Sequence, residues 1–148
     1  MREPRWLTRL MVDVMHSELL LEHGGSPGIR DGGEDLIESA LARPRNRFAY
    51  EPTSDLAALA AAYLFGLTKN HGYVDGNKRI GFAAAATFLL LNGLRLTASE
   101  ADAYETVVSL AEGHLSEEEI AGWIRGHTEP GAQDLERLSQ ASSLLERR

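Results

Sequence analysis

The sequence predicts an all-α fold for one compact domain. Two observations favour this fold class: apolar residues recur at helical spacing in several segments, and no strand-like run is long enough to build a sheet. Of the 148 residues, 43% are hydrophobic, which is enough to form one core. We expect a main domain over residues 1–127 and a peripheral, helical tail over residues 128–148.

The first third of the chain predicts two helices. Apolar residues at helical spacing over residues 6–22 predict the first, and the Gly24-Gly25 pair ends it. Residues 24–33 contain five glycines and a proline, which predicts a loop. A second helix is expected over residues 34–42, closed by Pro44. Residues 43–52, which are bracketed by prolines and contain three arginines, predict an exposed flap or hairpin.

Four more helices are expected in the rest of the main domain. Ser54 or Asp55 can cap a helix over residues 56–68, and Asn77 one over residues 77–91. Residues 82–91 are apolar all round, which places that helix at the centre of the fold. After a short extended segment at 94–96, Ser99 and Ser116 begin helices over residues 100–112 and 117–126 as capping boxes or near variants.

Composition excludes several classes of function. The net charge of −7 argues against nucleic-acid binding, which favours excess positive charge. The chain has no cysteine, so disulfides, thiolate catalysis and cysteine-ligated metals are excluded. There is no secretory signal pattern and no stretch of about 18 apolar residues, so we expect a cytoplasmic protein that does not contact a membrane.

One segment carries residues suited to phosphoryl chemistry: residues 69–82, KNHGYVDGNKRIGF. A neutral His71 can take a proton from a hydroxyl near pH 7, and Asp75 can hold Mg²⁺. Gly76 lets the backbone approach an anion, and the helix that follows offers free N–H groups to phosphate. Each residue alone has an ordinary structural interpretation. Their combination before an apolar helix indicates a functional site.

Lys78 and Arg79 break a local rule. Cations are disfavoured in the first turn of a helix because the helix dipole is already positive there. Two adjacent cations at this point cost stability unless an anion binds to them. The sequence therefore predicts a phosphate site at the start of this helix.

The segment HGYVDGNKR resembles the Fic/Doc signature, HxFx(D/E)(G/A)N(G/K)R, in the Asn-Lys-Arg variant of the death-on-curing (Doc) type. The segments GGSPGIRDGG, RFAYE and LLLNG also resemble this family, and the resemblance covers roughly residues 10–126. It implies a bundle of about six helices around a central apolar helix, with a short flap or hairpin beside the active site. Residues 1–127 would then form the catalytic domain.

The resemblance also implies roles for individual residues. His71 would be the general base, Asp75 would bind Mg²⁺ and orient the target hydroxyl, and Lys78 would stabilise charge on the transferred group. The ATP-binding set would be Lys69, Gly76, Asn77, Lys78 and Arg79, and a flap made of Arg47, Phe48, Ala49 and Tyr50 would pair with the backbone of the target.

Four positions depart from the common Fic pattern. Tyr73 replaces the usual Phe, and its ring suits the same core position if the hydroxyl finds a partner. Gly72 stands where many Fic proteins have proline. Adenylylating Fic enzymes have a glycine where this chain has Lys78 and a second arginine where it has Phe82. The last two differences favour transfer of the γ-phosphoryl group over transfer of AMP.

The resemblance implies a toxin of a toxin–antitoxin pair that uses ATP and Mg²⁺. It would phosphorylate a Ser or Thr of a translation factor, by resemblance elongation factor Tu, and so block translation. Its partners would be that target and a cognate antitoxin. Adenylylation by the same residues is the alternative. A non-catalytic binding module disagrees with the intact signature, and a metal-dependent phosphohydrolase would need further ligands at matching spacing.

Overall fold

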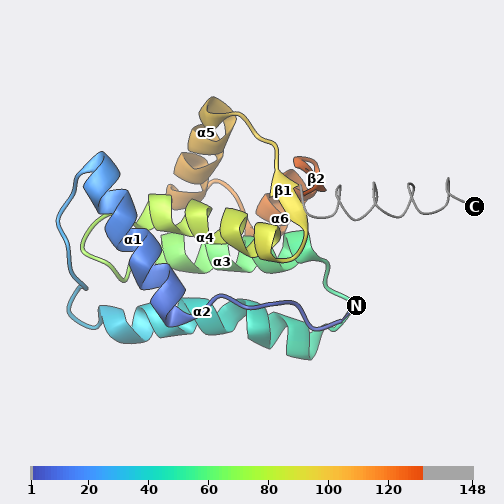
Figure 1. Ribbon diagram of the computed structural model, residues 1–148, viewed down its shortest axis with the longest axis horizontal. Coiled ribbons are helices and arrows are strands. Elements are labelled where there is room, and N and C mark those ends of the chain that lie inside the picture. Colours follow the sequence, from blue (N-terminus) through green and yellow to red (C-terminus); the bar gives the residue numbers. More distant parts are fainter. Residues whose placement is uncertain (1, 132–148) are drawn as a thin grey trace, which may run out of the picture.

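The computed structural model of the protein describes residues 2–131. The all-α prediction is confirmed, because this part of the chain is mainly helical (Figure 1). Most of the predicted helical tail, residues 132–148, lies outside the described residues. The elements in chain order are α1 (Arg9–His23), α2 (Gly33–Tyr50), α3 (Leu56–Asn70), α4 (Asn77–Leu91), β1 (Leu94–Leu96), α5 (Glu100–Ala111), α6 (Glu117–Arg125) and β2 (Thr128–Pro130).

Helices α2, α3 and α4 lie side by side, and α1 crosses α4 (Figure 1). α3 packs against α2, α4, α5 and α6, and nearly its whole length is buried. α4, for which the sequence predicts the central place, shares the centre with α3 and is less enclosed, since its Leu90 is 54% exposed. The alanines of α3 explain why α3 is the more buried of the two helices, because small side chains let neighbouring helices approach from several sides.

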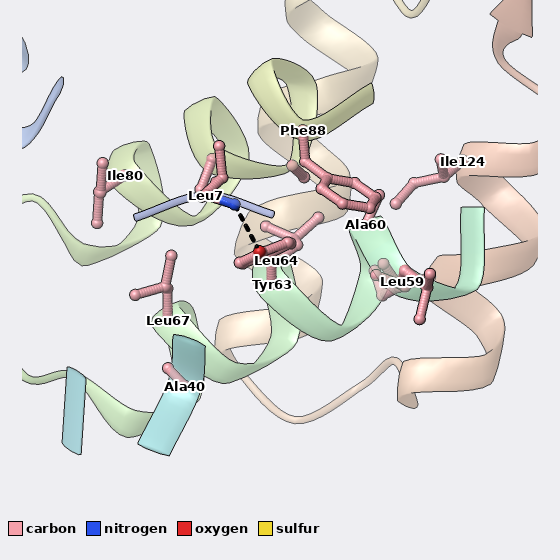
Figure 2. Close-up of a cluster of buried hydrophobic side chains, with 14 of the residues drawn as sticks. Leu7, Ala40, Leu59, Ala60, Tyr63, Leu64, Leu67, Ile80, Phe88 and Ile124 are labelled. Carbon is pink, nitrogen blue, oxygen red and sulfur yellow. Dashed lines mark hydrogen bonds between the residues drawn. The ribbon is translucent and has the colours of Figure 1, made fainter. Parts of the chain in front are cut away.

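The core is a contiguous cluster around Tyr63 of α3 and Phe88 of α4, whose ring centroids lie 5.1 Å apart. Figure 2 shows the Tyr63 hydroxyl accepting a hydrogen bond from the backbone N–H of Leu7 at 3.0 Å, which fastens the N-terminal segment to the core. Two glycines bring the helix backbones close together. A Cβ at Gly66 would lie 3.2 Å from the Ala40 Cα, and one at Gly81 would lie 2.5 Å from the Thr68 Oγ1.

Three predicted helix caps are confirmed, but the cap predicted at Asn77 is wrong, because Gly76 precedes α4 and no side chain caps that helix. The side chain of Asp55 accepts a hydrogen bond from the Ala58 N–H at 2.9 Å. Ser99 caps α5 in the same way through the Asp102 N–H. Ser116 and Glu119 form a complete capping box at α6.

The predicted flap over residues 43–52 is wrong, because α2 continues through Pro44 to Tyr50. A proline inside a helix removes one hydrogen bond and costs about 3 kcal/mol. Here the helix face around it is buried against α3, with Ala40, Leu41 and Pro44 all enclosed. Beyond the proline, Arg47 forms ion pairs with two glutamates of α6. This packing outweighs the local cost of the proline.

The extended segment predicted at 94–96 is strand β1, and it pairs antiparallel with β2. Arg95 lies opposite Glu129, and their side chains form an ion pair. Residues 128–130, which the sequence places in a helical tail, therefore form a strand. The expectation that no sheet forms is wrong for this short pair, in which backbone hydrogen bonding joins three residues on each side. None of the helices in residues 2–131 has the length and apolar character that crossing a membrane requires.

Candidate functional site

The loop between α3 and α4 carries the signature residues, and two residues in left-handed conformation shape it. His71 caps the end of α3 at φ 53° and ψ 49°, and it is the one non-glycine residue with positive φ among residues 2–131. Gly76 precedes α4 at φ 76°. Between these two residues the backbone turns back on itself, so that both ends of the signature meet at one place.

The buried side chain of Asn77 stabilises this loop by bonding to its backbone. Its side-chain oxygen accepts a hydrogen bond from the Tyr73 N–H at 3.0 Å, and its amide donates to the Tyr73 carbonyl at 2.9 Å. Asn77 is only 4% exposed. Its side chain therefore braces the loop, and only its backbone N–H is placed to contribute to an anion site at the start of α4.

Helix α1 contacts the signature loop through Tyr73. The Tyr73 hydroxyl donates to Asp13 Oδ1 at 2.6 Å, so it has the partner that a buried tyrosine requires. The ring of His16 stacks on the Tyr73 ring at 3.7 Å, and His16 Nε2 donates to the Asp75 carbonyl at 2.7 Å. His16 is only 4% exposed, because it packs against the signature loop.

The connection between α1 and α2 lies against the other side of the loop. Ile29 and Tyr73 form an antiparallel bridge, with the Arg30 N–H donating to the Gly72 carbonyl at 2.9 Å. A Cβ at Gly72 would lie 2.9 Å from the Gly33 carbonyl oxygen. The glycine that replaces the common proline thus permits this close approach.

The carboxylate of Asp75 is held in place by backbone donors. The Ser26 N–H donates to Oδ2 at 3.2 Å, and the Gly76 N–H donates to Oδ1 at 3.0 Å. These two bonds lower the pKa of Asp75 below its usual range, and the charge of nearby Arg79 acts in the same direction. Asp75 is exposed and ionised at neutral pH, and each oxygen keeps lone pairs for a cation.

The first turn of α4 carries positive charge that neither a capping side chain nor an acidic residue of this turn offsets. Its first residue follows Gly76, so no side chain caps the helix, and the first turn has no acidic residue. Lys78 and Arg79 are both exposed. The free N–H groups, the helix dipole and these two cations together favour an anion.

A cavity of about 800 Å³ opens in front of these residues. That volume is within the range of ligand-binding pockets. One wall is apolar and comes from α4 and α5, with Phe82, Ala103, Val107 and Val108. The predicted catalytic and ATP-binding residues line the same cavity: Lys69, His71, Asp75, Gly76, Asn77, Lys78 and Arg79.

The predicted target-binding residues are not part of this cavity. α2 runs antiparallel to α3, so Arg47, Phe48, Ala49 and Tyr50 lie near the start of α3, at the opposite end from His71. Arg47 borders a separate, smaller hollow between α2 and α6. Phe48 packs edge-on against Trp6 with 5.9 Å between ring centroids. Ion pairing accounts for the position of Arg47 and core packing for that of Phe48, whereas Ala49 and Tyr50 are exposed.

Sequence reasoning missed the residues that surround the signature loop, above all Asp13, His16 and Arg30. The Arg30 guanidinium donates to the His71 carbonyl at 2.7 Å and approaches His71 Nδ1 at 3.3 Å. The glycine-rich segment around Arg30 is part of the family resemblance. The resemblance therefore marks this segment as relevant, although it does not predict that Arg30 contacts His71.

Comparison with known proteins finds one matching family and similar sequences. The family model described as Fic/DOC family matches residues 6–89. The chain is 32% identical to "Protein kinase doc" of Escherichia phage P1 over 112 residues, which are 76% of this chain and 86% of that protein. It is 45% identical to "Toxin Doc" of Mycolicibacterium smegmatis over 76 residues, which are 51% of this chain and 57% of that protein.

Proposed function

The chain belongs to the Fic/DOC family, and from this premise we propose that it is a Doc-type toxin that phosphorylates a protein Ser or Thr with ATP and Mg²⁺. The observation that carries the proposal is the composition of the cavity lining. Lys78 and Phe82 both line the cavity, at the positions where adenylylating Fic enzymes have a glycine and a second arginine.

The cavity suits ATP in chemistry as well as in size. Its apolar residues from α4 and α5 suit a nucleobase, and Lys78, Arg79 and the free amides of α4 suit phosphates. Asp75 suits Mg²⁺, which is commonly held by one or two carboxylates together with substrate phosphates and water. When bound, Mg²⁺ would neutralise charge on the phosphates.

We assign the chemical step to this chain's own residues as follows. His71, which is exposed and lines the cavity, accepts the proton of the target hydroxyl. Asp75 orients that hydroxyl. Lys78 and the α4 amides stabilise the charge that develops on the transferred phosphoryl group. Asn77 acts indirectly, since its side chain keeps the loop closed.

For the target we assign the docking element to the connection between α1 and α2, in place of residues 47–50. Arg30 reaches His71 from this connection, so a target side chain that approaches His71 must pass beside it. The resemblance makes elongation factor Tu the first target to test and a small antitoxin the expected partner.

Labelled ATP distinguishes phosphorylation from adenylylation, which would use the same residues and cofactor. The full-length protein is incubated with Mg²⁺, a cell extract or purified elongation factor Tu, and ATP labelled at the α or the γ position. We expect label in a protein band from the γ position only. His71→Ala is the control and should lower transfer by about 10²- to 10⁴-fold. Label that enters protein from the α position alone would refute the kinase proposal.

A further inference from the structure

Arg30 is fixed next to His71 by its own backbone. Its N–H donates to the Gly72 carbonyl at 2.9 Å, and its carbonyl accepts from the Gly33 N–H at 2.7 Å. Both backbone groups are thus engaged on either side of the residue. The side chain leaves this anchored point and reaches His71, which is 41 residues away in sequence.

The shorter of its two contacts stabilises the unusual backbone of His71. Residues other than glycine rarely adopt the left-handed conformation that His71 has at φ 53°. His71 also ends α3, where the last carbonyls have no partner within the helix. The Arg30 Nη1 donates to one of these carbonyls at 2.7 Å and brings a positive charge to the negative end of the helix dipole.

The longer contact determines which ring nitrogen carries the proton. A guanidinium group has donors only and does not lose its proton in proteins. The His71 Nδ1 that lies 3.3 Å from Arg30 Nη1 must therefore act as acceptor. In a neutral imidazole the other nitrogen, Nε2, then carries the hydrogen.

We propose that Arg30 is a positioning residue that holds His71 in its left-handed conformation and selects the tautomer with the lone pair on Nδ1. This rests on the proposed role of His71 as the base. In the reaction the target hydroxyl replaces the longer Arg30 contact and gives its proton to Nδ1, while the shorter bond to the carbonyl remains. Without Arg30, the ring populates both tautomers and its backbone is less constrained.

A role for Arg30 in binding ATP is the competing explanation, and the geometry argues against it. Within the described residues, the side chains that line the cavity include Lys69, Lys78 and Arg79 but not Arg30. Loss of Arg30 should therefore lower the rate of transfer and leave the KM for ATP unchanged. A phosphate-binding arginine would show the opposite pattern.

Nitrogen NMR of the histidine ring tests the tautomer directly and needs no enzymatic activity. The full-length protein is labelled with ¹⁵N, and the His71 signals are identified by their absence from His71→Gln. In the wild type we expect Nδ1 at the position of an unprotonated ring nitrogen and Nε2 at that of a protonated one. In Arg30→Ala both signals should move toward each other. Unchanged ring signals would overturn the proposal.

Kinetics complete the test. We expect Arg30→Ala to lower kcat by about 10- to 100-fold, as loss of a group that orients a histidine does, with the KM for ATP within twofold. Asp35→Ala changes an exposed residue in the first turn of α2, outside this connection, and should alter neither the ring signals nor kcat. Arg30→Lys retains a positively charged donor group. It replaces Arg30→Ala in the test if that variant does not fold, and kcat and the ring signals should then change less but in the same direction.

The two measurements separate the possible failures. A wild-type protein without transfer activity, but with ring signals that depend on Arg30, would contradict the proposed function and leave the structural role of Arg30 intact. An active wild type in which Arg30→Ala raises the KM for ATP more than tenfold with unchanged ring signals would identify Arg30 as an ATP-binding residue and overturn the inference.

Discussion

The hydroxyl of Tyr73 gives the signature loop an attachment to α1 that the usual Phe cannot provide. It donates to Asp13 at 2.6 Å, and the Asp13 carboxylate also accepts from Arg9 at 2.9 Å. Tyr73→Phe should destabilise the protein by about 1 kcal/mol, because Asp13 keeps its bond to Arg9 and is partly hydrated. Transfer activity should remain, since Phe is the common residue of the signature. Urea unfolding and the transfer assay measure the two quantities.

Asp13→Asn and the double variant provide the control for this prediction. If the hydroxyl acts through Asp13, the two changes should be less than additive in the free energy of unfolding. Additive effects would mean that the hydroxyl stabilises the loop in another way.

Titration of the Tyr73 hydroxyl makes the difference in stability between the wild type and Tyr73→Phe depend on pH. Burial and the neighbouring Asp13 raise the pKa of Tyr73 above its usual range. A folded pKa above the unfolded value contributes stability that is present below about pH 10 and is lost as the pH rises further. Tyr73→Phe should therefore lose less stability above that pH than the wild type. Tyr63, whose pKa burial also raises, should retain part of the dependence in both proteins.

The candidate site could be predicted from the sequence only where its residues are neighbours in the chain. His71, Asp75 and Lys78 share one loop and helix start, so their chemistry and spacing were visible together. Asp13 and Arg30 come from other elements, and no local pattern shows that either contacts the loop. Asn77 illustrates another limit, because its chemistry suits an anion site but packing commits its side chain to the backbone of Tyr73.

At the scale of single elements, the first turn of α4 carries two cations that are predicted to bind phosphate but that lower the stability of the helix. Its two cations oppose the helix dipole, and each such charge is worth about 0.3–1 kcal/mol. Arg79→Ala should therefore leave the melting temperature without ligand equal or slightly higher. It should reduce the rise in melting temperature on adding Mg-ATP, because that rise depends on ligand affinity. Thermal melts with and without Mg-ATP measure both effects.

Arg125→Ala is a suitable comparison for Arg79→Ala. Arg125 lies in the last turn of α6, where the dipole favours a cation, and it pairs with Asp55 at 2.6 Å. Its removal should lower the melting temperature slightly and leave the Mg-ATP shift unchanged. A clear loss of stability in unliganded Arg79→Ala would instead identify Arg79 as a structural residue.

Local signals predicted where helices begin more reliably than where α2 ends. The side chains of Asp55, Ser99 and Ser116 bond to the backbone three residues ahead, so the sequence contains the whole interaction. Pro44 is an equally clear local signal, but α2 continues through it. The contacts that overcome the proline come from α3 and α6, which the sequence around Pro44 does not contain.

At the scale of the whole molecule, the spacing of the central helices depends on glycine. A Cβ at Gly81 of α4 would lie 2.5 Å from Thr68 Oγ1 and 3.2 Å from the Leu64 carbonyl oxygen of α3. Gly81→Ala should destabilise the protein by about 1–3 kcal/mol through overpacking, despite the better helix propensity of alanine. The free energy of unfolding in urea measures this change.

Gly122→Ala is the matched control, since Gly122 is exposed within α6 and a Cβ there would have no atom within 4 Å. This variant should stabilise the protein by up to about 1 kcal/mol. Equal effects of the two substitutions would mean that α3 and α4 separate without cost.

The bonds between the α1–α2 connection and the signature loop also matter for protein engineering. Glycine-rich surface connections are usually the first choice for inserting an epitope tag, a fluorophore site or a second domain. In this connection Gly28 and Arg30 are bonded to Val74 and Gly72, and Ser26 holds Asp75. An insertion within residues 26–30 would shift these partners and disturb the signature loop.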